Sequence, residues 1–477
     1  MFTILFFDDW NLQRRVNLER HLGSPTLVPE GTIEDSHADP AWGYPSVLRD
    51  AETHRWRCYY QGKVPRALKR PVALLAESDD GVHWELPDLT GRLDLPDRLC
   101  PHEIAEFHNE WCCVFEDERA ATAEERYKAL SANSLLVSSD GLRWERRERA
   151  RWSRRLIDPG YFAFWNQYRD TYVITRRPRV GDRRIAVSET PDWSSFTEPE
   201  LALQPDALDT PCALMYGMPV FSYEQLFVGL LWMFHTDPVI EPDEKYIGGF
   251  ADIPSARPND EPARIMGKID CQLAYSLNGW HFQRTLREPF IPNGAPGEHG
   301  SGCLYPSSMV VDGDTIRIYS SASRGEHAQI LADVESRQGA LLLHTLRRDG
   351  FVYLEPAGGT GELVTRLLVW KGGELHLNVN VPRGQALVEV MQRDGTPVDG
   401  YSYEDCLPFT GDSLDWTPGW RDGRGLDALA GEVLRIGVRL ANGRLYAVRG
   451  SLEFKTFVEA RGYIQDGEQS PPMPGFY

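Results

Sequence analysis

Short hydrophobic runs enriched in aromatic residues follow one another at short intervals along most of the chain. Examples begin at Trp56 ("WRCYYQG"), Trp111 ("WCCVFED"), Tyr172 ("YVITRR") and Ile316 ("IRIYSSAS"). Such runs are typical of β-strands. Helical periodicity is almost absent, and "TAEERYKAL" from Thr122 is the best short exception. The pattern predicts an all-β protein.

A polar corner recurs after several of these runs. In "LLAESDDGVHWELP", Ser78 precedes a turn that contains Gly81, and Trp84 follows three residues later. The later copies have their corner residues at Gly141, Pro191, Gly279 and Gly350, with a mean spacing of about 67 residues. Asp-Gly and Asn-Gly pairs supply the positive φ angles of two-residue hairpin turns. Each copy therefore predicts the same strand pair, repeated along the chain with insertions of variable length.

Five repeats of this length, each able to supply about four strands, predict a five-bladed β-propeller over residues 1–356. Repeated units that cannot bury their own faces must stack around an axis. The aromatic residue after each corner is then expected to pack between neighbouring blades. These corner aromatics are Trp84, Trp144, Phe282 and Tyr353, which we expect to be buried at equivalent positions.

The repeat ends near residue 357, in the glycine-rich segment "EPAGGTGELVTRL". Beyond it, clearly alternating segments are joined by Lys-Gly-Gly, Asp-Gly and Asn-Gly turns. This arrangement predicts an antiparallel β-sandwich over 357–460, followed by a proline-rich C-terminal tail over 461–477.

Composition narrows the classes of function. The chain has 42% hydrophobic and 25% charged residues, as soluble globular proteins do, and a net charge of −19. So negative a protein is not expected to bind nucleic acid or an anionic membrane. The longest apolar run, Phe227 to Phe234, is far shorter than the roughly 20 residues of a membrane span.

The N-terminal segment and the cysteines suggest a compartment. "MFTILFFDDW" lacks a basic segment and reaches Asp8 and Asp9 early, so we do not expect it to be a signal peptide. The eight cysteines are scattered and include no Cys-x-x-Cys pair. That distribution favours reduced thiols in a cytoplasm over a disulfide framework or a zinc site.

Several segments resemble a known group of proteins. "ILFFDDWNL", "YPSVLRDAETHRWRCYYQG", "CVFEDERAATAEERYKAL" and "SSDGLRWERR", followed by a β-sandwich, resemble uncharacterised bacterial proteins described as similar to glycoside hydrolase family 32. More broadly, the chain resembles the five-bladed superfamily of families 32, 43, 62 and 68. The resemblance covers nearly the whole chain as architecture. It implies a glycosidase that acts on a carbohydrate, with a furanoside as one substrate class.

The catalytic motifs of family 32 have partial counterparts here. That family carries Asn-Asp-Pro-Asn, Arg-Asp-Pro and Glu-Cys motifs on its first three blades. The corresponding segments of this chain are "HADPAWG", which contains Asp39, and "FEDERAA", which contains Asp117, and no clear Glu-Cys pair is present. The resemblance therefore implies catalytic carboxylates at Asp39 and Asp117.

Glycoside cleavage needs one carboxylic acid and one carboxylate, and a central funnel could bring them together from separate blades. Asp158 opens the third blade before the aromatic run "YFAFW". With Asp39 it is expected to serve as base, nucleophile or transition-state stabiliser. Glu298, in a glycine-rich loop, is the expected proton donor, and Asp117 and Asp9 are reserves. Each also has a structural alternative, such as an Asx turn at Asp39 or a strand-end cap at Asp117.

Aromatic and histidine side chains near the funnel mouth are candidates for sugar binding. They are Trp42, Tyr44, Phe164, Trp165, Tyr216, His299 and His327. The two histidines could bind sugar hydroxyls, hold a central ion or serve only as hydrogen-bonded structure. No cofactor is expected, since the chain contains no phosphate loop and no dinucleotide fingerprint, and no metal ligands are assigned, so whether a structural metal sits in the funnel stays open.

Two further classes of function remain open. A non-catalytic carbohydrate-binding propeller would account for the incomplete motifs. A glycoside phosphorylase on the same scaffold would need arginine, lysine and histidine side chains in the funnel to hold phosphate. The segment "ITRRPRVGDRR" from Ile174 could supply them, although it fits an outer pair of strands better.

Overall fold

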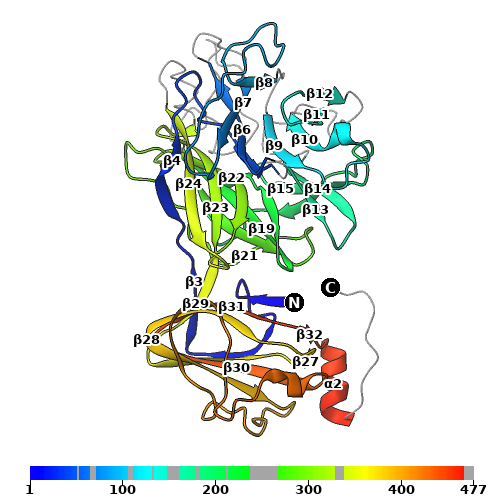
Figure 1. Ribbon diagram of the computed structural model, residues 1–477, viewed down its shortest axis with the longest axis vertical. Coiled ribbons are helices and arrows are strands. Elements are labelled where there is room, and N and C mark those ends of the chain that lie inside the picture. The colour runs from blue at the N-terminus through cyan, green and yellow to red at the C-terminus, as the bar shows by residue number, and fades with distance from the viewer. Residues whose placement is uncertain are drawn as a thin grey trace. The chain divides into compact units, whose positions relative to one another are not determined.

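The structure, a computed structural model, is almost entirely β, as the sequence predicts (Figure 1). It describes residues 1–50, 53–64, 71–105, 111–131, 134–147, 161–178, 183–210, 213–236, 267–327 and 338–466. The chain divides into two compact units. One unit is Pro25–Thr345, and the other combines Met1–Ser24 with Leu346–Tyr477.

The unit Pro25–Thr345 is a five-bladed β-propeller, and its first three blades are separate four-stranded antiparallel sheets. Blade I contains β5 (Ser46–Arg49), β6 (Trp56–Lys63), β7 (Pro71–Ser78) and β8 (Glu103–Ala105). Blade II contains β9 (Trp111–Glu116), β10 (Tyr127–Ser131), β11 (Ser134–Ser138) and β12 (Glu145–Arg147). Blade III contains β13 (Phe162–Asn166), β14 (Thr171–Arg176), β15 (Ile185–Thr190) and β16 (Glu200–Leu203). Strands pair in sequence order within each blade.

Blades IV and V are linked into one nine-stranded sheet by a single parallel bridge between Ile269 and Cys303. Blade IV contains β17 (Ala213–Gly217), β18 (Val220–Tyr223), β19 (Leu226–Thr236), β20 (Gly267–Ser276) and β21 (Gln283–Arg284). Blade V contains β22 (Cys303–Asp312), β23 (Thr315–Ser323), β24 (Gly339–Arg347) and β4 (Thr26–Ile33). Because β4 pairs with β24, an early strand completes the last blade and closes the ring.

Side chains connect the inner strands of neighbouring blades. The backbone N–H of Val47 in β5 donates to Ser308 Oγ in β22 at 3.0 Å, and that of Val114 in β9 donates to Ser46 Oγ in β5 at 2.9 Å. Neighbouring inner strands share little or no backbone ladder, so these side-chain acceptors satisfy N–H groups that would otherwise be buried unpaired.

The repeated corner is a capped turn rather than the expected two-residue hairpin. Ser78 Oγ accepts the N–H of Gly81 at 2.9 Å, while Asp80 Oδ1 accepts the N–H groups of Val82 and His83, both at 2.8 Å. Equivalent bonds form at Ser138, Asp140 and Gly141, and at Ser276, Asn278 and Gly279. The serine and the Asp or Asn recur because each satisfies backbone N–H groups of the turn.

Each of these corners contacts the preceding blade. The carbonyl oxygen of Asp140 in blade II accepts from Arg57 in blade I at 2.9 Å. Trp144 packs edge-on against Tyr59 of blade I and against Trp111. The corner of blade I contacts Arg317 and Tyr319 of blade V in the same way. The recurring residues of the corner therefore position one blade against the next.

The corner aromatics are less uniform than expected. Phe282 is buried, whereas Trp84 and Trp144 are half-buried at the blade junctions. Tyr353 departs from the expectation because it lies outside the propeller, half-buried in the second unit and stacked on His21. The fifth corner has Arg347 in place of the serine, and the chain leaves the propeller at that point.

The second unit is an antiparallel β-sandwich (Figure 1). Its strands are β1 (Phe2–Leu5), β2 (Leu12–Val16), β3 (Leu18–Leu22), β25 (Val352–Pro356), β26 (Thr360–Thr365), β27 (Leu368–Trp370), β28 (His376–Met391), β29 (Phe409–Trp416), β30 (Val433–Ala441), β31 (Arg444–Gly450) and β32 (Leu452–Phe454), followed by α2 (Phe457–Asp466). The first part of β28 pairs with β31 and its last part with β30, so this strand connects the two layers.

The first 24 residues belong to this sandwich and not to the propeller, which we expected to begin at residue 1. Strands β1, β2 and β3 pair with β31, β26 and β25 respectively. Pairing of the N-terminal strands with distant partners leaves no signal in local sequence, and so the boundary differs from the expected one.

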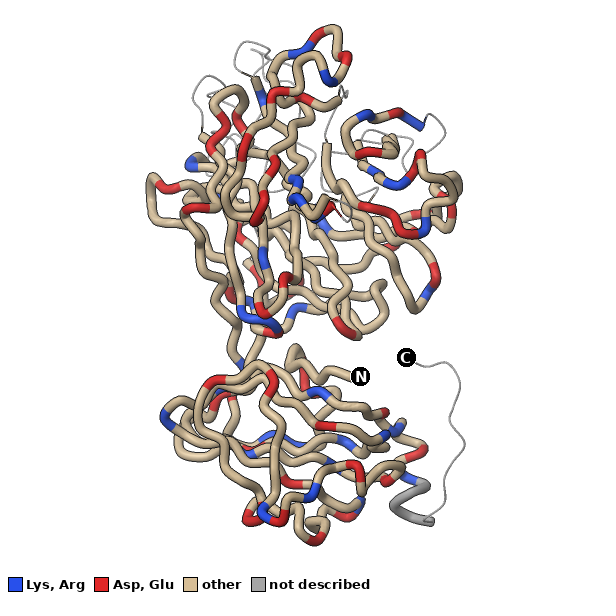
Figure 2. Tube along the Cα trace, in the orientation of Figure 1, with Lys and Arg blue, Asp and Glu red and all other residues tan. Residues whose placement is uncertain are grey.

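Acidic and basic positions are both scattered over the described parts of the two units, as Figure 2 shows. The seven described cysteines are buried free thiols: Cys58, Cys100, Cys112, Cys113, Cys271, Cys303 and Cys406. Among the described residues, no helix has the length and hydropathy needed to cross a membrane.

The blade-to-blade contact of the corner can be tested at Gly141, which has φ +74°. A Cβ at this position would lie 2.4 Å from the hydroxyl oxygen of Tyr59 in blade I. We expect Gly141→Ala to lower the free energy of unfolding by about 2–5 kcal/mol, from backbone strain and overpacking together. Urea denaturation of the whole chain measures this change.

Gly91→Ala is the matched control, because Gly91 has a similar φ of +80° but open space around its would-be Cβ. This variant should lose only the backbone contribution of about 1–2 kcal/mol. Equal losses in the two variants would show that the corner of blade II does not depend on its contact with blade I.

Candidate active site

Aromatic side chains gather where the inner strands of the propeller begin. The loop before β5 contributes Trp42 and Tyr44, the inner and second strands of blade IV contribute Tyr216, Trp232 and Phe234, and blade V contributes Tyr305 and His327. We call these seven residues the aromatic cluster. Most are buried, but Trp42 keeps a partly exposed face.

Polar atoms hold the rings of the aromatic cluster in place. Trp42 Nε1 donates to the Tyr305 hydroxyl at 3.0 Å, and His327 Nε2 lies 3.2 Å from the Tyr216 hydroxyl. Tyr44 stacks on Trp232 with ring centroids 5.4 Å apart. The rings are therefore positioned by hydrogen bonds as well as by packing.

Three cationic side chains lie against these rings. The guanidinium carbons of Arg177 and Arg183 lie 4.8 and 4.9 Å from the ring centroid of Tyr216. Lys63 Nζ, at the end of β6, lies 3.9 Å from the ring of Trp42. Cations at this distance are attracted by the faces of aromatic rings. This end of the propeller thus combines aromatic surface with positive charge.

Asp39 anchors the loop that carries Trp42 and Tyr44. Its Oδ1 accepts the N–H of Gly339 at 2.8 Å and that of Ala41 at 3.0 Å, and its Oδ2 accepts the N–H of Gln338 at 3.1 Å. Both carboxylate oxygens are thereby fixed in direction. The hydrogen bond from the N–H of Ala41 to Asp39 Oδ1 is the Asx turn that we named as the structural alternative for Asp39.

Asp117 lies at the opposite end of the propeller. Asp117 follows the last residue of β9, whereas Asp39 precedes β5. Strand direction alternates within each four-stranded blade, so all inner strands run in the same direction and the two residues lie at opposite ends of them. Asp117 is buried, with Oδ2 2.6 Å from Lys128 Nζ and Oδ1 accepting from the Tyr172 hydroxyl at 2.6 Å. Burial first, and then the hydrogen bond to Asp117, raise the pKa of Tyr172. These contacts are those of a structural ion pair.

The other candidate acids that the structure describes have different partners from Asp39. Glu298 is exposed, and its Oε2 accepts the N–H of Ala295 at 2.9 Å. Asp9 was expected in the funnel but lies in the sandwich unit, ion-paired with Arg15 and Arg20. Asp158 lies outside the described residues. No hydrogen bond or ion pair links any two of the candidate carboxylates that the structure describes.

The expected sugar-binding residues fall into two groups. Trp42, Tyr44, Tyr216 and His327 belong to the aromatic cluster. Phe164, Trp165 and His299 make other contacts. Phe164 is buried in the core against Phe227, Trp165 packs against Tyr172 and Arg119, and His299 Nε2 lies 2.8 Å from Glu34 Oε1.

Sequence reasoning missed several members of this site. Trp232, Phe234 and Tyr305 sit inside apolar strands whose facing direction the sequence does not reveal. Arg177 and Arg183 belong to "ITRRPRVGDRR", which we interpreted as an outer strand pair. The described start of this segment instead belongs to β14, the second strand of blade III, and Arg177 and Arg183 lie against the ring of Tyr216.

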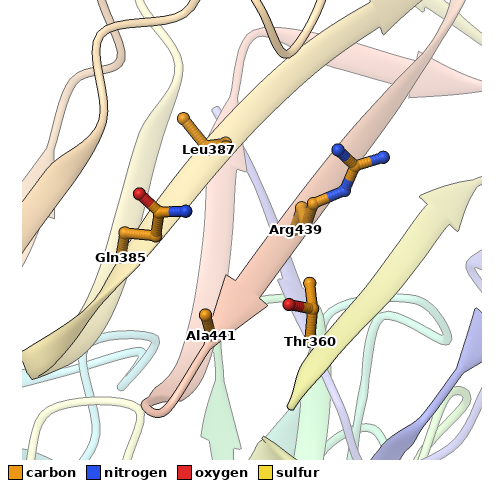
Figure 3. Close-up of a pocket in the computed structure, with 5 residues that line it drawn as sticks. All are labelled: Thr360, Gln385, Leu387, Arg439 and Ala441. Carbon is orange, nitrogen blue, oxygen red and sulfur yellow. The ribbon is translucent and has the colours of Figure 1, made fainter.

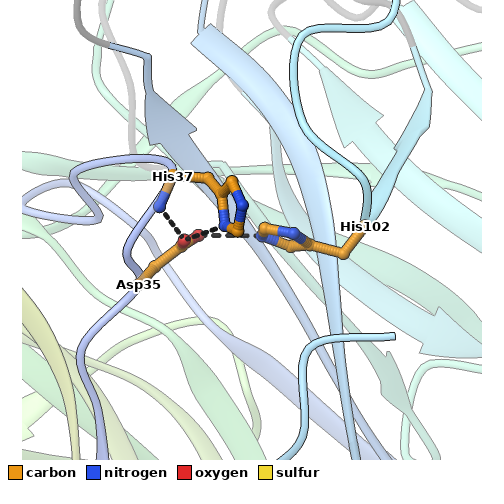
Figure 4. Close-up of side chains that lie close together, drawn as sticks. All are labelled: Asp35, His37 and His102. Carbon is orange, nitrogen blue, oxygen red and sulfur yellow. Dashed lines mark hydrogen bonds and ion pairs between the residues drawn. The ribbon is translucent and has the colours of Figure 1, made fainter. Parts of the chain in front are cut away.

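Two other places in the described chain offer polar groups to a ligand. Asp35, His37 and His102 bring three possible metal-ligand atoms within 4.8 Å of one another (Figure 4). In the sandwich, a depression of about 470 Å³ is lined by Thr360, Gln385, Leu387, Arg439 and Ala441 (Figure 3). Neither place contains the pair of carboxylates that glycoside cleavage requires.

Comparison with known proteins gave similar solved structures only; no family model and no curated protein matches the chain. An N-acetylgalactosamine deacetylase from F. plautii is 15% identical, covers 70% of this chain and 97% of its own, and has a TM-score of 0.43. A thermostable family-43 glycoside hydrolase is 14% identical, covers 69% and 96%, and has a TM-score of 0.41. The β-1,2-mannobiose phosphorylase from Listeria innocua is 13% identical, covers 69% and 96%, and has a TM-score of 0.38.

The structural role of Asp117 can be tested by substituting Lys128, whose side chain is 2% exposed. We expect Lys128→Met to lower the free energy of unfolding by about 3–5 kcal/mol, because it leaves the Asp117 carboxylate buried without its cation. Methionine keeps most of the side-chain volume, so the change reports on charge. Chemical denaturation followed by tryptophan fluorescence measures it.

The control is Asp79→Ala, which removes an exposed ion pair with Arg55 in the same unit. A loss within about 1 kcal/mol is expected there, since surface pairs contribute little. If Lys128→Met is no more destabilising than this control, Asp117 does not depend on the ion pair.

Proposed function

We propose that this chain is a carbohydrate-active enzyme that cleaves a glycosidic bond at the aromatic cluster of its propeller. The observation that carries the proposal is the convergence of Trp42, Tyr216 and His327 with Arg177 and Arg183 at one end of the blades. Ligand sites combine aromatic surface with a few placed polar groups. Apolar faces of a sugar ring suit the rings, and its hydroxyls suit the histidine and the arginines.

The chemistry requires two carboxyl groups near this cluster. In the proposal, Asp39 and Asp158 serve as base, nucleophile or transition-state stabiliser, and Glu298 donates the proton to the leaving oxygen. Three backbone N–H groups orient the carboxylate of Asp39, which supports a fixed charged role. Asp117 and Asp9 have no part in it, because their ion pairs hold them elsewhere. Hydrolysis, of a furanoside among other substrates, follows from the family resemblance.

Phosphorolysis is the second candidate, and one observation favours it. Arg177 and Arg183 both contact Tyr216, whose hydroxyl lies 3.2 Å from His327. Guanidinium groups bind phosphate through paired hydrogen bonds and are well suited to hold it as the attacking group. In that case phosphate would take the place of water at the anomeric carbon and the product would be a sugar 1-phosphate.

The experiment is a panel of aryl glycosides and disaccharides, including furanosides, assayed with and without inorganic phosphate. A hydrolase releases free sugar at a rate that does not depend on phosphate. Asp39→Asn should lower kcat by about 10²–10⁴-fold. Arg183→Gln should raise the KM for phosphate if the enzyme is a phosphorylase and leave phosphate without effect if it is a hydrolase.

Trp10→Ala is the control, since Trp10 is an exposed tryptophan of the sandwich unit. Its kinetics should match those of the unmodified chain, whereas Trp42→Ala should raise the KM for sugar. Binding of sugar without any turnover, unchanged by Asp39→Asn, would identify a non-catalytic propeller. Full activity in both Asp39→Asn and Trp42→Ala would place the site elsewhere.

A further inference from the structure

Asp35, His37 and His102 form a compact group of side chains between the loop after β4 and blade I (Figure 4). Asp35 and His37 follow β4, and His102 immediately precedes β8. His102 Nε2 lies 2.8 Å from Asp35 Oδ2, and His37 Nδ1 lies 3.8 Å from Asp35 Oδ1. Two imidazoles and a carboxylate therefore face one small volume.

The carboxylate at the centre of the group is oriented by its surroundings. Asp35 Oδ2 also accepts from the Tyr60 hydroxyl at 2.9 Å, while its Oδ1 accepts the N–H of His37 at 2.7 Å and that of Ala38 at 3.2 Å. Burial alone would raise the pKa of Asp35. The hydrogen bond and charge of His102, together with the other donors, outweigh burial, so the pKa lies below its usual value. Asp35 is thus an anionic, preoriented carboxylate.

We propose that Asp35, His37 and His102 form a binding site for a divalent transition-metal ion such as zinc. Imidazole nitrogens and carboxylate oxygens are ligands that zinc accepts, and three protein ligands leave the fourth position to water. Bonds of about 2.0–2.2 Å place neighbouring ligand atoms of a tetrahedral site about 3.3 Å apart. The three ligand atoms lie within 4.8 Å of one another, so side-chain rotations that bring the more widely spaced atoms closer would complete the site.

Burial also fits such a site. Asp35 and His102 are 4% and 1% exposed, whereas His37 faces solvent. The ion would enter from the His37 side. Hydrogen bonds from Tyr60 and two backbone N–H groups supply the outer support that metal-ligating carboxylates usually have.

On metal binding, His102 Nε2 would exchange its contact with Asp35 for the ion. His102 Nδ1 is buried and has no hydrogen-bond partner among the described residues.

A metal here would strengthen the closure of the propeller. The loop after β4 leaves the outermost strand of blade V and leads into β5, the inner strand of blade I. His102 and Tyr60 belong to blade I. The ion would therefore tie the closing segment of the ring to its first blade. This inference does not depend on the proposed function.

The test is titration of the full chain, freed of metal by EDTA and dialysis, with zinc chloride and cobalt chloride. We expect one equivalent bound per chain by calorimetry, visible absorption from cobalt in a tetrahedral site and a rise in Tm with zinc. His37→Ala should keep the far-UV circular dichroism of the unmodified chain, because His37 is exposed. It should weaken binding by at least the roughly 10–100-fold that loss of a supporting partner costs.

His83→Ala is the matched control, since His83 is an exposed histidine beside Asp80 that belongs to no such group. Its metal affinity should equal that of the unmodified chain. The proposal is overturned if the unmodified chain takes up neither metal stoichiometrically. It is equally overturned if His37→Ala binds zinc as tightly as His83→Ala.

Discussion

Closure of five separate sheets around one axis is the constraint on which the rest of this structure depends. Inner strands of adjacent blades share little or no backbone ladder, and their N–H groups would be costly to bury unpaired. Ser46 and Ser308 provide acceptors at two junctions, and Cys113 Sγ accepts the N–H of Ala163 at 3.1 Å at a third. Between blades, small side chains thus accept the backbone N–H groups that carbonyl oxygens accept within each blade.

Closure also determines where chemistry can occur. The centre of the ring is filled by apolar side chains from several blades, including Cys112, Leu214, Ile269 and Cys303, all buried. Two groups of charged side chains flank these apolar residues: the cations against the aromatic cluster, and the buried pair of Asp117 and Lys128.

Local chemistry made much of the fold predictable. The Ser-x-Asp-Gly corner encodes its own hydrogen bonds, so the repeat could be found in the sequence and the number of blades inferred from it. The fifth copy likewise follows the third strand of its blade, β24, but Arg347 replaces the serine and the chain passes there into the sandwich. Pairing of β1 with β31 joins strands more than 400 residues apart, and no local pattern predicts it.

The candidate site was less predictable for the same physical reason. Trp42 and Tyr216 were identified from loop position and aromatic character, which are local properties. Whether Arg177 points inward or outward depends on the packing of blades III and IV, and hydrophobic alternation does not specify it. Asp35 and His102 are 67 positions apart, and only the tertiary fold brings them together.

The central claim is that the propeller acts on sugar at the end that carries the aromatic cluster. A crystal structure of the chain soaked with a disaccharide or its product tests this most directly. The account predicts a sugar ring in contact with Trp42 and within hydrogen-bonding distance of Arg183 or His327. Sugar bound only at Trp165 beside Asp117, or only over Arg439 in the sandwich, would contradict it.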